Sequence, residues 1–89
     1  METAELTVNS KQGLHARPAD LFIRTANQFS CDIKVKYLTT GSDFVNAKSI
    51  LRVLSLGVYN RHIIQIQAEG NDELQAIKGI SALVKSNFS

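Results

Sequence analysis

Two hydrophobic periods alternate along these 89 residues, and this alternation constrains the fold more than any other feature of the sequence. Residues 5–9, 31–38 and 62–68 alternate apolar and polar side chains, which is the pattern of half-buried β-strands. Residues 44–47 can return beside 31–38 as a short strand, across a turn of about five residues, TTGSD. Because every second strand residue is polar, we expect a sheet with one face in solvent.

The helical period appears in two longer segments. In the first, apolar side chains recur at i, i+3, i+4 and i+7, and Phe29 follows as an expected core anchor. Pro18 lies near the start of this helix, where a missing N–H costs nothing. The apolar faces are Ala19, Phe22, Ile23 and Ala26 in the first helix, and Leu74, Ile77, Ile80 and Val84 in the last.

The start of the last helix follows a turn at Gly70 and Asn71. Asp72 is expected to cap this helix, with Gln75 three residues later in a capping-box arrangement. Gly79 lies inside the helix and lowers its stability by up to about 1 kcal/mol relative to alanine.

Residues 48–56, KSILRVLSL, can form one to two helical turns, with Ser49 as N-cap and Gly57 as the stop. This segment has more apolar residues than one buried stripe needs. We expect Val53 and Leu56 to face inward and the other three apolar side chains to be exposed, namely Ile50, Leu51 and Leu54. Clustered exposed apolar side chains indicate a surface that binds a partner; full burial of the helix is the alternative.

The element order is therefore β-α-β-β-α-β-α, which is typical of an α+β fold with helices on one face of a sheet. The length suits one domain, 1–89. The chain has no apolar run of 18 residues, so we expect no membrane insertion, and the start METAELTVNS does not resemble a signal peptide. Cys31 is the single cysteine; we expect it in the core or at its rim, and in a reducing compartment.

Charge and ligand spacing exclude several functions. Ten Lys and Arg stand against eight Asp and Glu without any basic run, which disfavours nucleic-acid binding. His15, Cys31 and His62 lack the spacing of a metal site, so we expect no metal and no cofactor. We interpret His62, at the start of its strand, as a hydrogen-bonded edge histidine.

The segment GLHARPA, residues 13–19, contains the residues with chemical potential. His15 directly precedes a helix whose first N–H groups and dipole favour an anion. A neutral imidazole there is a competent nucleophile, since the helix end disfavours the imidazolium, and Arg17 offers a fork of donors to phosphate oxygens. The alternative is that His15 is a capping polar residue and Arg17 a solvated charge.

GLHARPA and the later segment NAKSILRVLSLGV together resemble the HPr family, the histidine-containing phosphocarriers of the bacterial phosphotransferase system. The resemblance covers essentially the whole chain and implies an open-faced β-sandwich with four antiparallel strands and three helices. It implies that His15 is phosphorylated on Nδ1 by enzyme I at the expense of phosphoenolpyruvate and passes the phosphoryl group to EIIA domains of sugar permeases. A carrier of this kind is not a stand-alone enzyme.

The resemblance also implies roles for neighbouring residues. Arg17, the Ala16 backbone N–H and Pro18 match the family's phosphoryl-binding positions, and Ser49 matches a serine that a dedicated kinase phosphorylates. Ile50, Leu51 and Leu54 match the partner surface. Arg52 adds a cation near this surface, and Arg24 either steers acidic partners or is a solvated charge. The implied partners are enzyme I, EIIA domains, an HPr kinase/phosphorylase and a catabolite regulator, and we expect a cytoplasmic monomer.

The sequence departs from the family pattern in one place, because the hairpin around TTGSDF is about three residues longer, at a loop tip. Two other functions stay open beside sugar transport. One is a regulatory module that acts through Ser49 and the apolar helix, and the other is a nitrogen-linked phosphotransferase relay. His15 argues against a homologue that is purely regulatory.

Overall fold

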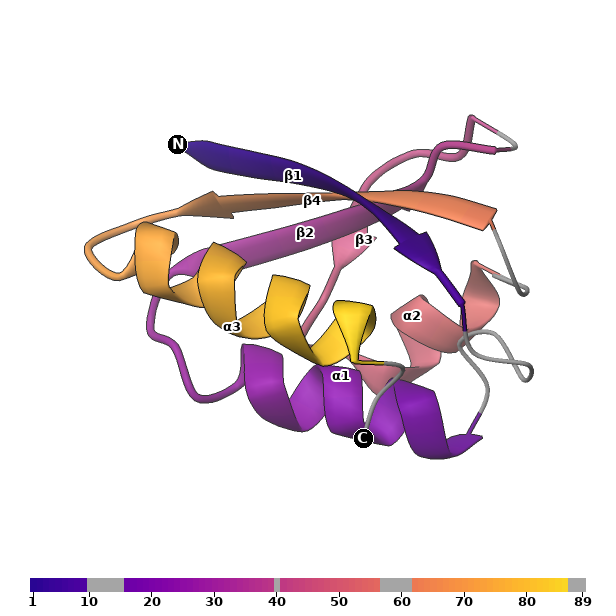
Figure 1. The fold of residues 1–89 in the computed structure, drawn as a ribbon, viewed down its shortest axis with the longest axis horizontal. Helices are drawn as coiled ribbons and strands as arrows, with labels where there is room; N and C mark the ends of the chain where they lie inside the picture. Colours follow the sequence, from indigo (N-terminus) through magenta and orange to yellow (C-terminus); the bar gives the residue numbers. More distant parts are fainter. Residues whose placement is uncertain (10–15, 40, 57–61, 87–89) are drawn as a thin grey trace.

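The computed structural model describes residues 1–9, 16–39, 41–56 and 62–86. These residues form the predicted order of elements. The strands and helices are β1 (Glu2–Val8), α1 (Ala16–Ala26), β2 (Asp32–Tyr37), β3 (Val45–Asn46), α2 (Ile50–Ser55), β4 (His62–Glu69) and α3 (Glu73–Lys85). Figure 1 shows the three helices on one face of the sheet, which confirms the expected α+β architecture.

The sheet has the order β1-β4-β2-β3, and every neighbouring pair is antiparallel. β1 pairs along its whole length with β4, from Glu2 opposite Ala68 to Val8 opposite His62. β1 therefore starts three residues before the alternation beginning at Glu5 predicted. The expectation that His62 lies on an edge strand is wrong, because β4 has β1 on one side and β2 on the other.

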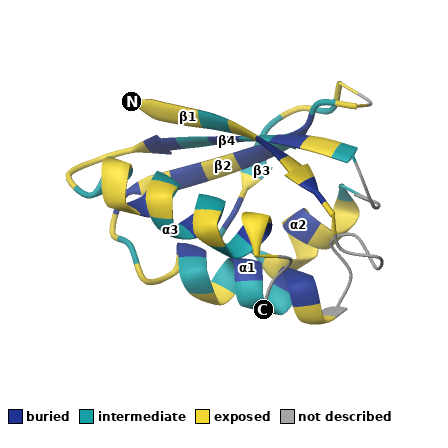
Figure 2. Cartoon of the chain, in the orientation of Figure 1, coloured by how far each residue is buried: buried dark blue, intermediate teal, exposed yellow. Residues whose placement is uncertain are grey.

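The core lies between the sheet and the helices. Every second strand residue lines it on the sheet side, and the apolar faces of the helices line it on the other side (Figure 2). On the two central strands the buried side chains are Ile33, Val35, Tyr37, Ile64, Ile66 and Ala68. Below them lie Ala19, Phe22 and Ala26 of α1, Val53 of α2, and Ala76, Ile80 and Val84 of α3. The opposite strand face is mostly polar, with Ile63 as an exposed apolar residue, so the predicted solvent-exposed face of the sheet is confirmed.

The start of α3 differs from the prediction in two respects. Leu74 is 47% exposed, and Ala76 takes its place in the core. Asp72 occupies the N-cap position of α3, as predicted, but its side chain makes no capping hydrogen bond, so the predicted capping box with Gln75 is wrong. Its carboxylate instead accepts from the backbone N–H groups of Ser30, at 2.8 Å, and Cys31, at 2.9 Å. Those donors precede β2 and have no strand partner, which explains why they attract the carboxylate.

The connection from β2 to β3 is longer than the five residues expected, because β2 ends at Tyr37 and β3 begins only at Val45. Ser42 stabilises this connection through two hydrogen bonds to the backbone of Tyr37. Its N–H donates to the Tyr37 carbonyl at 3.1 Å, and its Oγ accepts from the Tyr37 N–H at 2.9 Å. Gly41, at φ 74°, takes the left-handed conformation that this turn requires.

Candidate functional site

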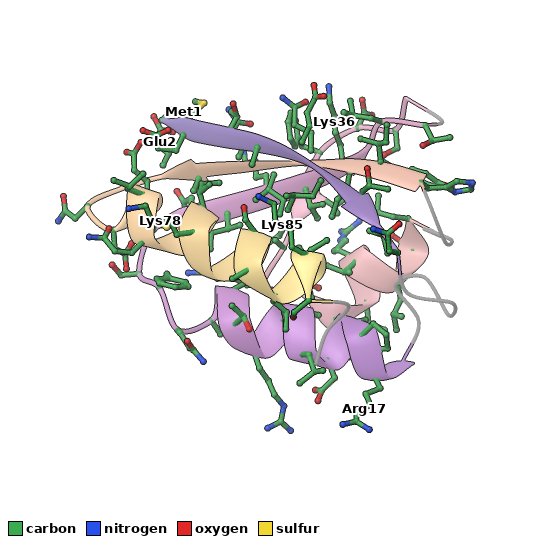
Figure 3. The ribbon with its side chains drawn as sticks, in the orientation of Figure 1. Met1, Glu2, Arg17, Lys36, Lys78 and Lys85 are labelled. Carbon is green, nitrogen blue, oxygen red and sulfur yellow. The ribbon has the colours of Figure 1, made fainter. Side chains whose placement is uncertain are left out.

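The first turn of α1 is the part of the predicted phosphoryl site that the structure describes. α1 begins at Ala16, and His15 lies outside the described residues. Because the first N–H groups of a helix have no intrahelical acceptor, the Ala16 and Arg17 amides are available to an anion at this end. The Arg17 side chain is exposed and points away from the sheet (Figure 3).

Pro18 has a different role from its neighbours. It is buried and has no N–H to donate, so it cannot offer a backbone hydrogen bond to phosphoryl oxygens. Its ring fixes φ near the helical value at the third residue of α1. Pro18 therefore shapes the start of the helix, while Ala16 and Arg17 supply the described donors.

Ser49 is the N-cap of α2, as predicted. Its backbone is extended, with φ −108° and ψ 116°, and its Oγ accepts from the Arg52 N–H at 3.5 Å. The Ser49 carbonyl accepts from the Val53 N–H at 3.0 Å and starts the helical bonding. The Ser49 side chain is half-buried at the end of a short helix, where an added phosphate would lie against the α2 N-terminus.

The apolar residues of α2 divide between two faces as the sequence predicts. Val53 is fully buried, and Leu56, after the helix end, packs partly buried against the core. The other three form an exposed group that we call the α2 patch: Ile50 at 41%, Leu51 at 77% and Leu54 at 37% exposure. The alternative that the helix is fully buried is therefore wrong. That the α2 patch binds a partner stays a prediction.

α2 packs against α1, and the charges of these two helices are mostly positive. Their charged residues are three arginines, Arg17, Arg24 and Arg52, and a single acid, Asp20. Arg24 Nε lies 2.9 Å from Asp20 Oδ2, and the two residues of this ion pair are one helical turn apart. Arg24 is thus ion-paired on the exposed face of α1, and its role toward a partner stays a prediction.

Two contacts that the sequence did not suggest hold the segment before α2 against the end of α1. Lys48 Nζ donates to the Phe29 carbonyl at 2.6 Å. Asn27 Nδ2 donates to the Ile23 carbonyl at 2.9 Å and lies 3.4 Å from the Lys48 carbonyl. No local pattern marks these residues, because both partners are backbone carbonyls about twenty residues away from Lys48 or Asn27. Together they hold Lys48, the residue before Ser49, against the end of α1.

Two ionisable side chains outside this site, Cys31 and Asp72, have shifted pKa values. Burial, followed by the hydrogen bond with Asp72, raises the pKa of the Cys31 thiol to about 11. Cys31 is buried, as expected, and its thiol stays protonated at neutral pH. Hydrogen bonds, first from the Ser30 N–H and then from Cys31, hold the pKa of Asp72 below its usual value of 3.8. These groups stabilise a turn and belong to no reactive cluster.

His62 lies at the start of β4, opposite Val8 at the end of β1. Its Nδ1 is hydrogen-bonded to the hydroxyl of Tyr37, and the two rings lie 5.3 Å apart. The expected hydrogen bonding of His62 is therefore confirmed. In the described part of the chain, no group of three His, Cys, Asp or Glu residues could hold a metal ion.

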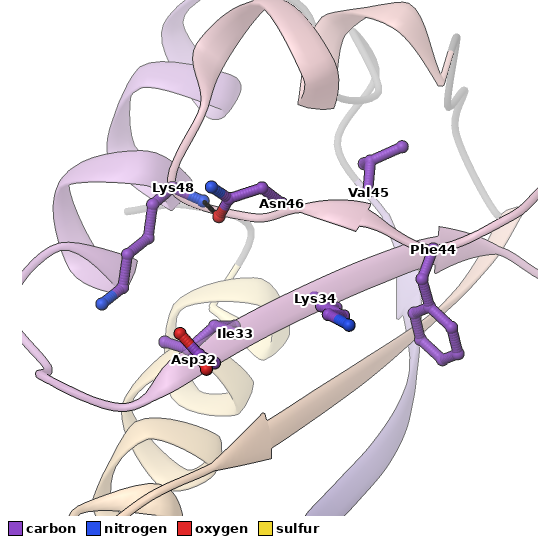
Figure 4. Close-up of a pocket in the computed structure, with 7 residues that line it drawn as sticks. All are labelled: Asp32, Ile33, Lys34, Phe44, Val45, Asn46 and Lys48. Atoms are coloured by element: carbon purple, nitrogen blue, oxygen red, sulfur yellow. Dashed lines mark hydrogen bonds between the residues drawn. The ribbon is translucent and has the colours of Figure 1, made fainter.

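A surface hollow of about 350 Å³ lies at the β2–β3 pair (Figure 4). It is lined by Asp32, Ile33, Lys34, Phe44, Val45, Asn46 and Lys48. None of the predicted site residues lines it. Across the described residues, we find no helix that is long and apolar enough to cross a membrane.

The comparisons with known proteins identify the family. Residues 2–86 match the family model described as "PTS HPr component phosphorylation site", PTS-HPr. The chain therefore belongs to the HPr family, the phosphocarriers of the phosphotransferase system. The fold is thus that of an HPr domain.

Two curated relatives are similar over 97% of this chain. They are the multiphosphoryl transfer proteins of Vibrio cholerae, at 34% identity, and of Escherichia coli O157:H7, at 38% identity. The chain spans only 22% and 23% of the length of these relatives.

Solved structures of HPr proteins have the same fold as this chain. HPr-C-His from Thermoanaerobacter tengcongensis is 43% identical, with a TM-score of 0.93, over 99% of this chain and 96% of that one. The phosphocarrier protein HPr of Bacillus anthracis is 37% identical, with a TM-score of 0.86, over 93% and 95%. Crh of Bacillus subtilis, 35% identical with a TM-score of 0.75 over 100% and 99%, is a swapped, intertwined dimer. This dimer conflicts with the expected monomer, and that expectation is not retained.

Proposed function

We propose that this chain accepts a phosphoryl group on His15 Nδ1 from phospho-enzyme I, and ultimately from phosphoenolpyruvate, and passes it to EIIA domains of sugar permeases. The observation that carries the proposal is the exposed Arg17 side chain in the first turn of α1, beside N–H groups that have no helical acceptor. His15 directly precedes this turn in the sequence.

The chemistry is an in-line displacement at phosphorus. The lone pair of neutral His15 Nδ1 forms the new P–N bond while the bond between phosphorus and enzyme I breaks, and its electron pair stays on enzyme I. Transfer to EIIA repeats this step with the carrier as donor. Arg17 and the first amides of α1 neutralise the phosphoryl oxygens, so the chain supplies positioning and charge and needs no cofactor or metal.

We assign partner docking to the α2 patch together with Arg17, Arg24 and Arg52. The support is an exposed apolar group surrounded by mostly positive charge, which fits a partner with an apolar groove and an acidic rim. A relay requires partners to exchange, so we expect small and short-lived interfaces. In this reading the chain works in the cytoplasm, where its phosphoryl donor is made.

We further propose Ser49 as a site of regulatory phosphorylation by an HPr kinase/phosphorylase, with a catabolite regulator as reader. Its N-cap position supports this, because a phosphoserine there would meet the positive end of α2 and place two negative charges beside the α2 patch. The alternatives are a module that acts only through Ser49 and this patch, and a nitrogen-linked relay.

The test is intact mass after the protein is mixed with phosphoenolpyruvate and enzyme I, with His15→Ala as control. One acid-labile phosphoryl group on the wild type and none on the variant is the expected result. No adduct, with an enzyme I that phosphorylates a reference HPr, would refute the carrier function. An acid-stable phosphate from a kinase, lost in Ser49→Ala, would support regulation, and the EIIA domain that accepts the phosphoryl group distinguishes sugar from nitrogen-linked branches.

A further inference from the structure

Asp20 lies between two arginines on the exposed face of α1. Arg17 is three residues before it and Arg24 four residues after it, so both side chains can reach its carboxylate. Asp20 is also the only acidic residue in α1 and α2. Any carboxylate from this surface that neutralised Arg17 would have to be that of Asp20.

The structure pairs Asp20 with Arg24. Arg24 Nε donates to Asp20 Oδ2 at 2.9 Å, and both side chains are well exposed, at 76% and 47%. Within residues 1–9, 16–39, 41–56 and 62–86, no carboxylate forms an ion pair with Arg17. Figure 3 shows the Arg17 side chain extending from the start of α1 into solvent.

Helix electrostatics explain this choice. An acid four residues before a base is the favourable order for an ion pair on a helix. The Arg17–Asp20 pair has the reverse order, with the cation at the positive end of the helix, where it is disfavoured. Arg24 therefore competes successfully for Asp20, and its absence would leave Arg17 as the remaining partner on this face.

We propose that Arg24 is a positioning residue for phosphoryl transfer, which acts by holding the Asp20 carboxylate away from Arg17. The inference rests on the proposed function and adds to it. Arg17 is kept unpaired, so its guanidinium does not have to leave a carboxylate before it binds phosphoryl oxygens. The effect is distinct from direct contact between Arg24 and a partner, and it requires the presence of Asp20.

The experiment compares Arg24→Gln, Asp20→Asn and the double variant with the wild type. Phosphoryl transfer from phospho-enzyme I is followed by rapid quench at low ionic strength. We expect Arg24→Gln to slow transfer about twofold, as one exposed helical ion pair allows, and Asp20→Asn not to slow it. The double variant should transfer faster than Arg24→Gln, because without Asp20 no carboxylate of α1 or α2 competes for Arg17, although docking still lacks the Arg24 charge.

A double variant as slow as Arg24→Gln would overturn the inference and show that Arg24 acts on the partner itself. Equal rates in all four proteins would also overturn it. A wild type that accepts no phosphoryl group would instead refute the proposed carrier function, and the two failures are therefore distinguishable.

A second readout needs no partner. The Nε–Hε resonance of Arg17 in the unphosphorylated protein should move in Arg24→Gln, as it does on ion pairing, and should not move in the double variant. Added salt should reduce this difference, since exposed pairs are screened. A resonance unchanged in Arg24→Gln would contradict the exchange of partners. Thermal unfolding by circular dichroism confirms that all four proteins are folded.

Discussion

The carboxylate of Asp72 accepts a hydrogen bond from the backbone N–H of Cys31, 41 residues earlier, at 2.9 Å. This bond and its companion to the Ser30 N–H tie the turn before α3 to the start of β2. Gly70 completes the contact, because at φ 148° its backbone lies so close that an added Cβ would be 2.7 Å from Cys31 Cβ. One acidic side chain thus joins two connections of the fold.

The pH dependence of stability should reflect this bond. The folded-state pKa of Asp72 is lowered from 3.8, so the ionised carboxylate stabilises the fold above pH 3.8, and this contribution is lost as pH falls through the folded-state pKa. We expect Asp72→Asn to unfold at lower denaturant concentration than wild type at pH 7, and the difference to shrink towards pH 2. Urea unfolding across this pH range measures it.

Glu73 provides the matched control, because the Met1 ammonium and the Gly70 N–H lower its pKa as well. Glu73→Gln should remove its own acid-dependent contribution and leave that of Asp72. If Asp72→Asn were as stable as wild type at pH 7, the role of this carboxylate would be wrong.

Cys31 should be unreactive in the folded protein. With a thiol pKa of about 11, the thiolate is a minute fraction at pH 7.5, and the side chain is buried. We expect iodoacetamide to modify Cys31 slowly in buffer and rapidly in 6 M guanidinium. Equal rates in the two solutions would contradict the burial.

Gly79 and Phe29 should show coupled effects on stability. A Cβ at Gly79 would lie 3.1 Å from Cζ of the Phe29 ring, so the better helix propensity of alanine is offset by crowding. We expect Gly79→Ala to gain little in wild type and about 1 kcal/mol in a Phe29→Ala background. The same gain in both backgrounds, measured by chemical unfolding, would show that the ring moves aside without cost.

Substitutions on the exposed face of α2 should affect docking, and substitutions on its buried face should affect stability. Leu51→Glu changes a side chain that is 77% exposed and should leave unfolding nearly unchanged while weakening binding to enzyme I. Val53→Ala opens a cavity in the core and should cost about 2 kcal/mol. Unchanged affinity of Leu51→Glu for enzyme I, by calorimetry, would mean that the α2 patch is not the docking surface.

Arg17→Ala tests the phosphoryl site. The side chain is exposed, so the variant should unfold like wild type, within about 0.5 kcal/mol. Loss of one charged donor to the phosphoryl oxygens should slow transfer by about tenfold or more. Arg17→Lys, which keeps charge but not the fork of donors, should recover only part of the rate. Wild-type rates in Arg17→Ala would remove this residue from the mechanism.

Local patterns were sufficient for much of the fold and part of the site. Alternation along β2 and β4 predicts which side chains are buried, because neighbouring strand residues must point to opposite faces. The same reasoning separated Val53 from Leu51 on α2 and identified Ser49 as its cap. Such patterns depend on residues two to four positions apart, whose geometry the backbone determines.

Partners far apart in the sequence were beyond this reasoning. The central place of β4, the Tyr37–His62 hydrogen bond and the use of Asp72 at Cys31 all join segments at least 25 residues apart. The exposure of Leu74 depends likewise on how α3 lies across the sheet. The sequence by itself therefore determined the order of the elements, most of their inward faces and the motif before α1 that we propose to carry the phosphoryl group. Only the tertiary structure decided which polar groups meet, because an unpaired donor donates to whichever acceptor the packed chain brings within reach.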